Sequence, residues 1–269
     1  MKKILQIGNG IAFVSVVFIN YLSNTGLLNN TTIGEISKDL NSLFTPAGYA
    51  FSIWGLIYLL LLGFAIYQGR SLFVKVRNDD FVLETGPWFI LSCIFNCAWI
   101  FSWIYEYTGL SCIFIFLLLF CSENQTINQK IVWKNRMELW DAPFSVILFL
   151  WWPFVMYSGW VTVASIANVS SYLVKIDWNG FGISPKIWTL IMIIIATAIN
   201  LIITWKRNMR EFGMVGAWAL IAIGVANNGD NLLIAYTAFT TAAILIISSS
   251  IHGFKNRHTN PFKKMMQKK

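Results

Sequence analysis

The chain has 269 residues, of which 57% are hydrophobic and only 12% are charged. A soluble domain of this length cannot bury so much apolar surface, so the composition excludes an ordinary soluble fold and indicates a membrane protein. The formal net charge of +8 does not indicate a nucleic-acid-binding protein. The basic residues lie in loops beside apolar stretches and in a tail, rather than on one folded face.

Apolar stretches long enough to cross a bilayer follow one another along the chain. A helix needs about 20 residues to cross the hydrocarbon core. The third and fourth stretches are joined by a short turn at 107–109, and the seventh and eighth by a polar turn at 227–231, so each pair predicts a helical hairpin. We predict an all-α polytopic membrane bundle of about eight transmembrane helices, at roughly 4–28, 46–69, 87–106, 108–122, 143–170, 185–205, 212–228 and 231–251.

The Lys and Arg residues between these spans are divided unequally between the two sides. Seventeen of the 20 fall on the side that holds both termini, and only Lys38, Lys175 and Lys186 fall on the other. Basic residues are enriched in cytoplasmic loops. We therefore expect an integral, multi-pass protein of a bacterial plasma membrane, with its N- and C-termini in the cytoplasm.

Aromatic and amide side chains recur at helical spacing in the second, third and fifth spans. Residues three, four and seven positions apart share one face of a helix. The three stripes are Phe51, Trp54 and Tyr58 in the second span; Asn96, Trp99 and Trp103 in the third; and Trp160, Ala164 and Asn168 in the fifth.

The predicted topology places these stripes at one depth, in the non-cytoplasmic half of the membrane. Amides in hydrocarbon need interhelical partners. An aromatic-walled cavity with two amides, and with the small Ala164 leaving room beside Trp160, would suit a flat apolar ligand with a few polar edges. The alternative is a tightly packed aromatic core in which the Asn side chains form structural hydrogen bonds, and the residues alone leave both open.

Three segments resemble the translocator protein family, also called the tryptophan-rich sensory proteins (TspO/MBR). Residues 45–54, Thr-Pro-Ala-Gly-Tyr-Ala-Phe-Ser-Ile-Trp, resemble the signature of its second helix. Asn96 and Trp99 match its N-x-x-W pattern in the third helix, and the spacing of Trp160, Ala164 and Asn168 is similar to that of its fifth. The resemblance covers residues 1 to about 175.

The resemblance implies a five-helix domain at 1–175, which would leave three additional transmembrane helices at 176–254 and a basic cytoplasmic tail at 255–269. It further implies binding of a tetrapyrrole such as protoporphyrin or haem, or of a sterol or lipid, and often a homodimer. No cofactor is expected to be required. The candidate ligand-binding residues are Pro46, Tyr49, Phe51, Trp54, Tyr58, Asn96, Trp99, Trp103, Trp160, Ala164 and Asn168.

Catalysis by ordinary side chains has no support in the sequence. No cluster of acid, base and nucleophile is visible, so we expect no catalytic residues, although porphyrin breakdown has been attributed to some members of the family. The four cysteines lie within predicted spans and the two histidines near the C-terminus, which indicates neither a disulfide framework nor a metal site. A small-molecule secondary transporter and a structural membrane subunit without a ligand remain alternative functions.

Overall fold

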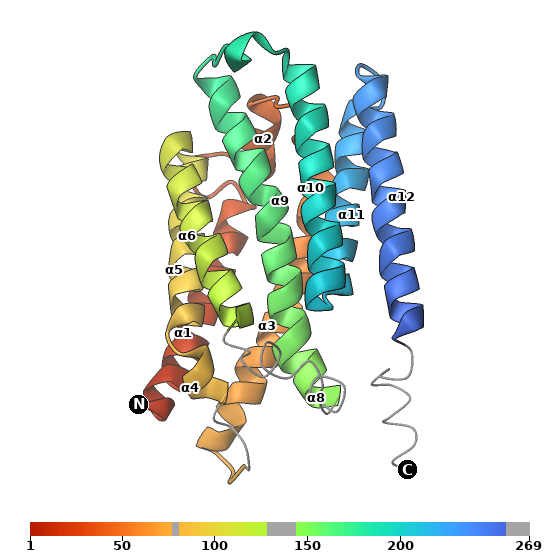
Figure 1. The fold of residues 1–269 in the computed structure, drawn as a ribbon. Coiled ribbons are helices and arrows are strands. Elements are labelled where there is room, and N and C mark those ends of the chain that lie inside the picture. Colours follow the sequence, from red (N-terminus) through yellow and green to blue (C-terminus); the bar gives the residue numbers. More distant parts are fainter. Residues whose placement is uncertain (77–80, 128–143, 257–269) are drawn as a thin grey trace.

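The computed structural model describes residues 1–76, 81–127 and 144–256, and in these ranges every regular element is a helix. The helices form an elongated bundle (Figure 1). Most of the predicted basic tail and the basic residues Arg77, Lys130, Lys134 and Arg136 lie outside the described residues. The start of α1 and the end of α12 lie at the same end of the bundle, as an even number of crossings requires (Figure 1).

Within the described ranges, six helical segments are long and apolar enough to cross a membrane, which makes the protein a polytopic helical membrane bundle. The shorter apolar helix α5 (Trp88–Ile104) and the largely buried α11 (Arg210–Asn227) run alongside them. The six segments are Lys2–Ser23 (α1), Gly48–Leu72 (η1, Gly48–Ser52; α3, Ile53–Gly69; η2, Arg70–Leu72), Thr108–Gln125 (in α6, Thr108–Ile127), Phe144–Lys175 (α8, Phe144–Val146; η4, Ile147–Trp151; α9, Trp152–Lys175), Pro185–Arg207 (α10) and Leu232–Lys255 (α12).

The connection between the first two spans contains a short helix that the hydrophobic pattern did not predict. α1 ends at Ser23, earlier than the expected boundary near residue 28, and the chain turns before α2 (Ile33–Asp39). A capping box starts α2, because the Thr32 hydroxyl accepts from the Glu35 backbone N–H while the Glu35 carboxylate accepts from the Thr32 backbone N–H. In Figure 1, α2 lies beside α9, in the half of the bundle that also holds the connection between α9 and α10.

The fifth span contains a π-helical turn, η4, between the short α8 and α9. Pro153, near the start of α9, has no backbone N–H, and its ring conflicts with the carbonyl four residues earlier in a regular helix. A π turn relieves that conflict by widening the helix locally. The turn also directs Phe149 against α3, where its ring approaches Gly63 and stacks on Tyr67 at 5.2 Å between centroids.

The three helices after residue 176 pack on the preceding ones through α11. α11 contacts α9, and the backbone and side chain of Phe212 and the side chain of Val215 lie against Gly159. α11 also contacts η1: the Ala47 backbone N–H donates to the Ala222 carbonyl at 3.0 Å, and α10 and α12 pack on α11 in turn. The group formed by α10, α11 and α12 thus contacts the start of the second span through α11.

Candidate functional site

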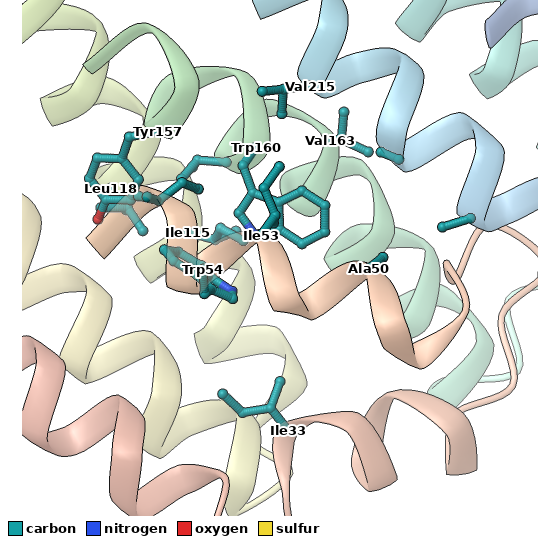
Figure 2. Packing of buried hydrophobic residues seen from close by; sticks show 14 of the residues in the cluster. Ile33, Ala50, Ile53, Trp54, Ile115, Leu118, Tyr157, Trp160, Val163 and Val215 are labelled. Carbon is teal, nitrogen blue, oxygen red and sulfur yellow. The ribbon is translucent and has the colours of Figure 1, made fainter. Parts of the chain in front are cut away.

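One aromatic cluster joins the start of the second span to α9. Trp54 and Tyr58 on α3 stack with ring centroids 5.4 Å apart, as their positions one turn apart allow. Trp160 of α9 meets Phe51 and Trp54 edge to face, at 6.1 Å and 6.4 Å. Figure 2 shows Trp160 beside Trp54 and Ile53. Trp160 is only 2% exposed, so these predicted site residues come together in the core.

Tyr157 completes this cluster, although the sequence analysis did not single it out. Its ring lies 5.9 Å from that of Trp54, and its hydroxyl accepts a hydrogen bond from the Asn96 amide at 3.0 Å. Tyr157 precedes Trp160 by three residues and so shares its helix face, a spacing that could have identified it. The Asn96 amide nitrogen thus has the interhelical partner that a buried amide needs.

A second cluster joins α5 to α6 and α9. The Trp99 indole N–H donates to the Asn168 side-chain oxygen at 2.6 Å, and the Asn168 amide donates to the Ser111 hydroxyl at 2.8 Å. Trp103 stacks on Trp99 at 6.1 Å and donates to the Ile33 carbonyl at 3.3 Å. Trp99, Trp103 and Asn168 are all buried. Both indole N–H groups therefore have acceptors. The hydrogen bonds of this cluster connect α5, α6, α9 and α2.

A cavity of about 510 Å³ lies between α1 and the η1–α3 segment, and we call it the aromatic hollow. Four of the predicted site residues line it, and it faces α1 rather than lying between α3, α5 and α9. Ile33 of α2 lies opposite Trp54 across it (Figure 2). Its lining is Val17, Asn20, Tyr21, Asn24, Ile33, Gly48, Tyr49, Phe51, Ser52, Trp54, Gly55 and Tyr58.

Polar atoms beside the aromatic hollow lack hydrogen-bond partners. The Trp54 indole nitrogen, the Tyr58 hydroxyl and the Asn20 side-chain nitrogen are buried, and none has a partner within the described part of the chain. The Trp160 indole nitrogen behind them also has no hydrogen-bond partner among the described residues. Buried polar groups are normally paired, and leaving one unpaired costs about 1–3 kcal/mol. Three residues with unpaired donors, Asn20, Trp54 and Tyr58, thus line the aromatic hollow.

A second cavity of about 440 Å³ lies between α2, residues 41–48 and the end of α11, and we call it the polar hollow. Predicted site residues Pro46 and Phe51 line it, and Phe51 and Gly48 line both hollows. Its polar lining comprises Thr32, Glu35, Ser37, Lys38, Asn41, Ser42, Thr45 and Asn227.

The other predicted site residues line neither hollow. Asn96, Trp99, Trp103, Trp160 and Asn168 are buried in the two clusters, and Ala164 is half-buried against the core.

Tyr49 lines the aromatic hollow but is 43% exposed, and its ring meets Trp218 of α11 edge to face at 5.4 Å. The Trp218 indole N–H donates to the Ala50 carbonyl at 3.1 Å, which fixes η1 against α11.

Sequence reasoning also missed the contribution of α1 to the aromatic hollow. Asn20 and Asn24 are one helical turn apart, and the Asn24 amide donates to the Asn20 backbone carbonyl at 2.8 Å.

All four cysteines are free. Among the residues with described positions, no group of three or more His, Cys, Asp and Glu side chains could hold a metal ion.

Comparison with known proteins identifies the family. Neither a curated protein nor a solved structure matches the chain. The family model described as TSPO-like protein matches residues 6–251, and so extends through α10, α11 and most of α12, beyond the five-helix segment on which the sequence resemblance rests. Since this match covers most of the chain, the chain belongs to the TSPO-like protein family.

Proposed function

We propose that this TSPO-like membrane protein binds a flat, largely apolar ligand of the tetrapyrrole class, such as protoporphyrin or haem, in the aromatic hollow. The observation that carries the proposal is the combination of Trp54 and Tyr58 along a cavity with their unpaired polar atoms. The proposed role is binding, in the sense of sensing or carrying, and no residue is assigned a catalytic step.

The shape and lining of the aromatic hollow support this ligand class. Its volume of about 510 Å³ falls within the range of about 300–1,000 Å³ that small-molecule sites occupy. Phe51, Trp54 and Tyr58 offer aromatic surface to a planar molecule, and offset or edge-to-face ring contacts contribute about 0.5–1.5 kcal/mol each. An indole N–H without an acceptor can also be met by the π face of a ligand ring.

The position of the hollow in the membrane follows from the proposed topology. Gly48 begins the second span, so the residues from Gly48 to Tyr58 occupy one end of the bundle. If both termini are cytoplasmic, as the division of basic residues favours, this end is the non-cytoplasmic one. Tyr21 and Tyr49 line the hollow and are exposed, and a ligand dissolved in the outer leaflet would meet them first. Labelling of single cysteines placed at Lys2 and Lys186 from either side of the membrane tests this orientation.

A titration of purified protein in lipid nanodiscs tests the ligand assignment. Protoporphyrin is added and binding is followed by the shift of its Soret absorption band. We expect Trp54→Leu to lower the affinity about tenfold or more, equivalent to about 1.4 kcal/mol. Trp205→Leu is the matched control, because Trp205 lies on α10 and lines neither hollow.

Two outcomes would contradict the proposal. Binding of a sterol or a phospholipid, but of no porphyrin, by the wild-type protein would remove the tetrapyrrole assignment. Alternatively, equal affinities of the wild-type, Trp54→Leu and Trp205→Leu proteins for protoporphyrin would show that the ligand binds away from the aromatic hollow.

A further inference from the structure

The two hollows adjoin each other beneath α2. Both are lined by Gly48 and Phe51. At the start of α2, Ile33 lines the aromatic hollow while its neighbours Thr32 and Gly34 line the polar hollow. The boundary between the hollows therefore runs from the first turn of α2 to the η1 turn, and one ligand of sufficient length would occupy both.

Two glycines lie along this boundary, next to the shared side chain of Phe51. A Cβ atom added to Gly34 or to Gly48 would meet nothing within 4 Å. Neither glycine has a positive φ, so the backbone conformation does not require glycine at these positions. Both glycines line the polar hollow, and each leaves open space beside the backbone near the boundary.

The polar hollow offers hydrogen-bond donors and one cation. Lys38 is its basic lining residue, and Lys38 takes part in none of the ion pairs found between described residues. Its acidic lining residue, Glu35, is held in the capping box, with its carboxylate 2.8 Å from the Thr32 backbone nitrogen. The Thr45 hydroxyl is buried and has no partner in the described structure. A cation and an unpaired hydroxyl match the needs of a carboxylate.

The additional helix α11 supplies one wall of the polar hollow, through Ala226 and Asn227. The Asn227 amide donates to the Leu43 carbonyl at 3.0 Å and to the Ile223 carbonyl of its own helix at 2.9 Å. These bonds fix the segment that leads to Thr45 and Pro46 against the end of α11. The polar hollow thus depends on a helix outside the first five spans.

We propose that the two hollows form one binding site for an amphiphilic ligand, in which the aromatic hollow holds the planar ring system and the polar hollow holds a carboxylate near Lys38 and Thr45. This inference rests on the proposed function and adds the chemical class of the ligand's polar end. It also gives α11 a role in ligand binding, because α11 closes the polar half of the site.

The test compares protoporphyrin, which carries two carboxylates, with its dimethyl ester, which carries none, in the same nanodisc titration. We expect Lys38→Gln to lower the affinity for the acid about fivefold or more and to change the affinity for the ester less than twofold, because only the acid loses a charge partner. Lys186→Gln is the matched control, since Lys186 lies at the start of α10 on the same side and lines neither hollow. It should leave both affinities within twofold of the wild type.

A second pair of variants tests the passage between the hollows. Gly48→Leu would fill the open space at the boundary and is expected to lower the affinity for the acid about tenfold. Gly10→Leu is the matched control on α1, because a Cβ at Gly10 also meets nothing within 4 Å and Gly10 lines neither hollow. This variant should leave binding unchanged. Circular dichroism and size-exclusion profiles identical to the wild type are required of each variant.

The outcomes separate the two proposals. If the wild-type protein binds neither porphyrin, the proposed function fails and this inference fails with it. If acid and ester bind equally well and Lys38→Gln changes neither, the polar hollow does not hold the carboxylate, while the aromatic site stands. If Lys38→Gln and Lys186→Gln weaken the acid equally, a general surface charge effect replaces the specific site and the inference is wrong.

Discussion

The α3 side and the α5 side of the bundle both contain buried aromatic and polar side chains, but the two regions differ in whether the polar atoms have hydrogen-bond partners. Around Trp99 each indole N–H and the Asn168 amide has a hydrogen-bond partner, and neither hollow reaches the cluster. Around Trp54 the indole N–H and the Tyr58 hydroxyl have no hydrogen-bond partner in the part of the chain that the structure describes, and a cavity lies beside them. The residue types do not distinguish the two regions, but their hydrogen bonding does.

This difference indicates how a tryptophan-rich membrane core can contain both a support and a site. A satisfied buried network rigidifies the helices that it joins, because each broken bond leaves a polar group without water. An unsatisfied donor beside a cavity is a cost that a ligand can remove. We therefore interpret the Trp99 cluster as the support on which the Trp54 cluster is positioned, through the Trp103 bond to α2 and through α9.

The largest expected effect is that of Trp99→Ala on stability. Removing this buried indole leaves a cavity and strands the Asn168 oxygen, so the free energy of unfolding should fall by about 3–5 kcal/mol, measured by denaturation in mixed detergent micelles. Phe101→Ala on the same helix is the control, since Phe101 is 39% exposed and should cost far less. Equal losses in the two variants would contradict a supporting role for Trp99.

A matched pair of Trp→Phe substitutions sharpens the comparison. Trp99→Phe removes the donor to Asn168 and should cost about 1–3 kcal/mol of unfolding free energy beyond the lost ring volume. Trp54→Phe removes an N–H that has no partner, so its cost should be at least about 1 kcal/mol smaller. If Trp54→Phe proved the more destabilising of the two, the distinction between support and site would be wrong.

The smallest expected effect separates stability from binding at Tyr58. Tyr58→Phe removes an unpaired hydroxyl, so the free energy of unfolding without ligand should change by less than about 0.5 kcal/mol. Protoporphyrin affinity in the Soret titration should fall by about threefold to tenfold, the size of one hydrogen bond of about 1 kcal/mol. Tyr157→Phe is the contrasting variant, because the Tyr157 hydroxyl already accepts from Asn96 and its loss should lower stability. A stability loss of the same size in both variants would show that Tyr58 has a partner in the folded protein.

The helices themselves follow closely from the sequence, because a bilayer admits few alternatives to them. Long apolar stretches must satisfy their backbone groups internally, which predicts spans such as Pro185–Arg207 and Leu232–Lys255 to within a few residues. The short helix α2 was not predicted, because its seven residues carry a polar capping signal and no long apolar period. The π turn before Pro153 likewise depends on local backbone geometry that hydropathy does not record.

The candidate site was predictable only in part. Helical spacing brings Trp54 over Tyr58 and places Trp160 on the face of α9 that meets them, and both contacts are present. Spacing cannot tell on which side of Trp54 a cavity lies, because that depends on how far α1 stands from α3. It also cannot show that the Trp99 indole donates to Asn168, 69 residues away, while the Trp54 indole has no hydrogen-bond partner among the described residues.

The sequence by itself therefore determined the membrane bundle, the family and the helix faces on which the aromatic residues lie, since apolar length and helical period are local properties of the chain. Only the tertiary structure decided which indoles are hydrogen-bonded, where the hollows lie and that α11 closes one of them. Those features depend on the distances between segments far apart in the chain, such as Ala47 and Ala222, and such distances are set by the packing of the whole bundle.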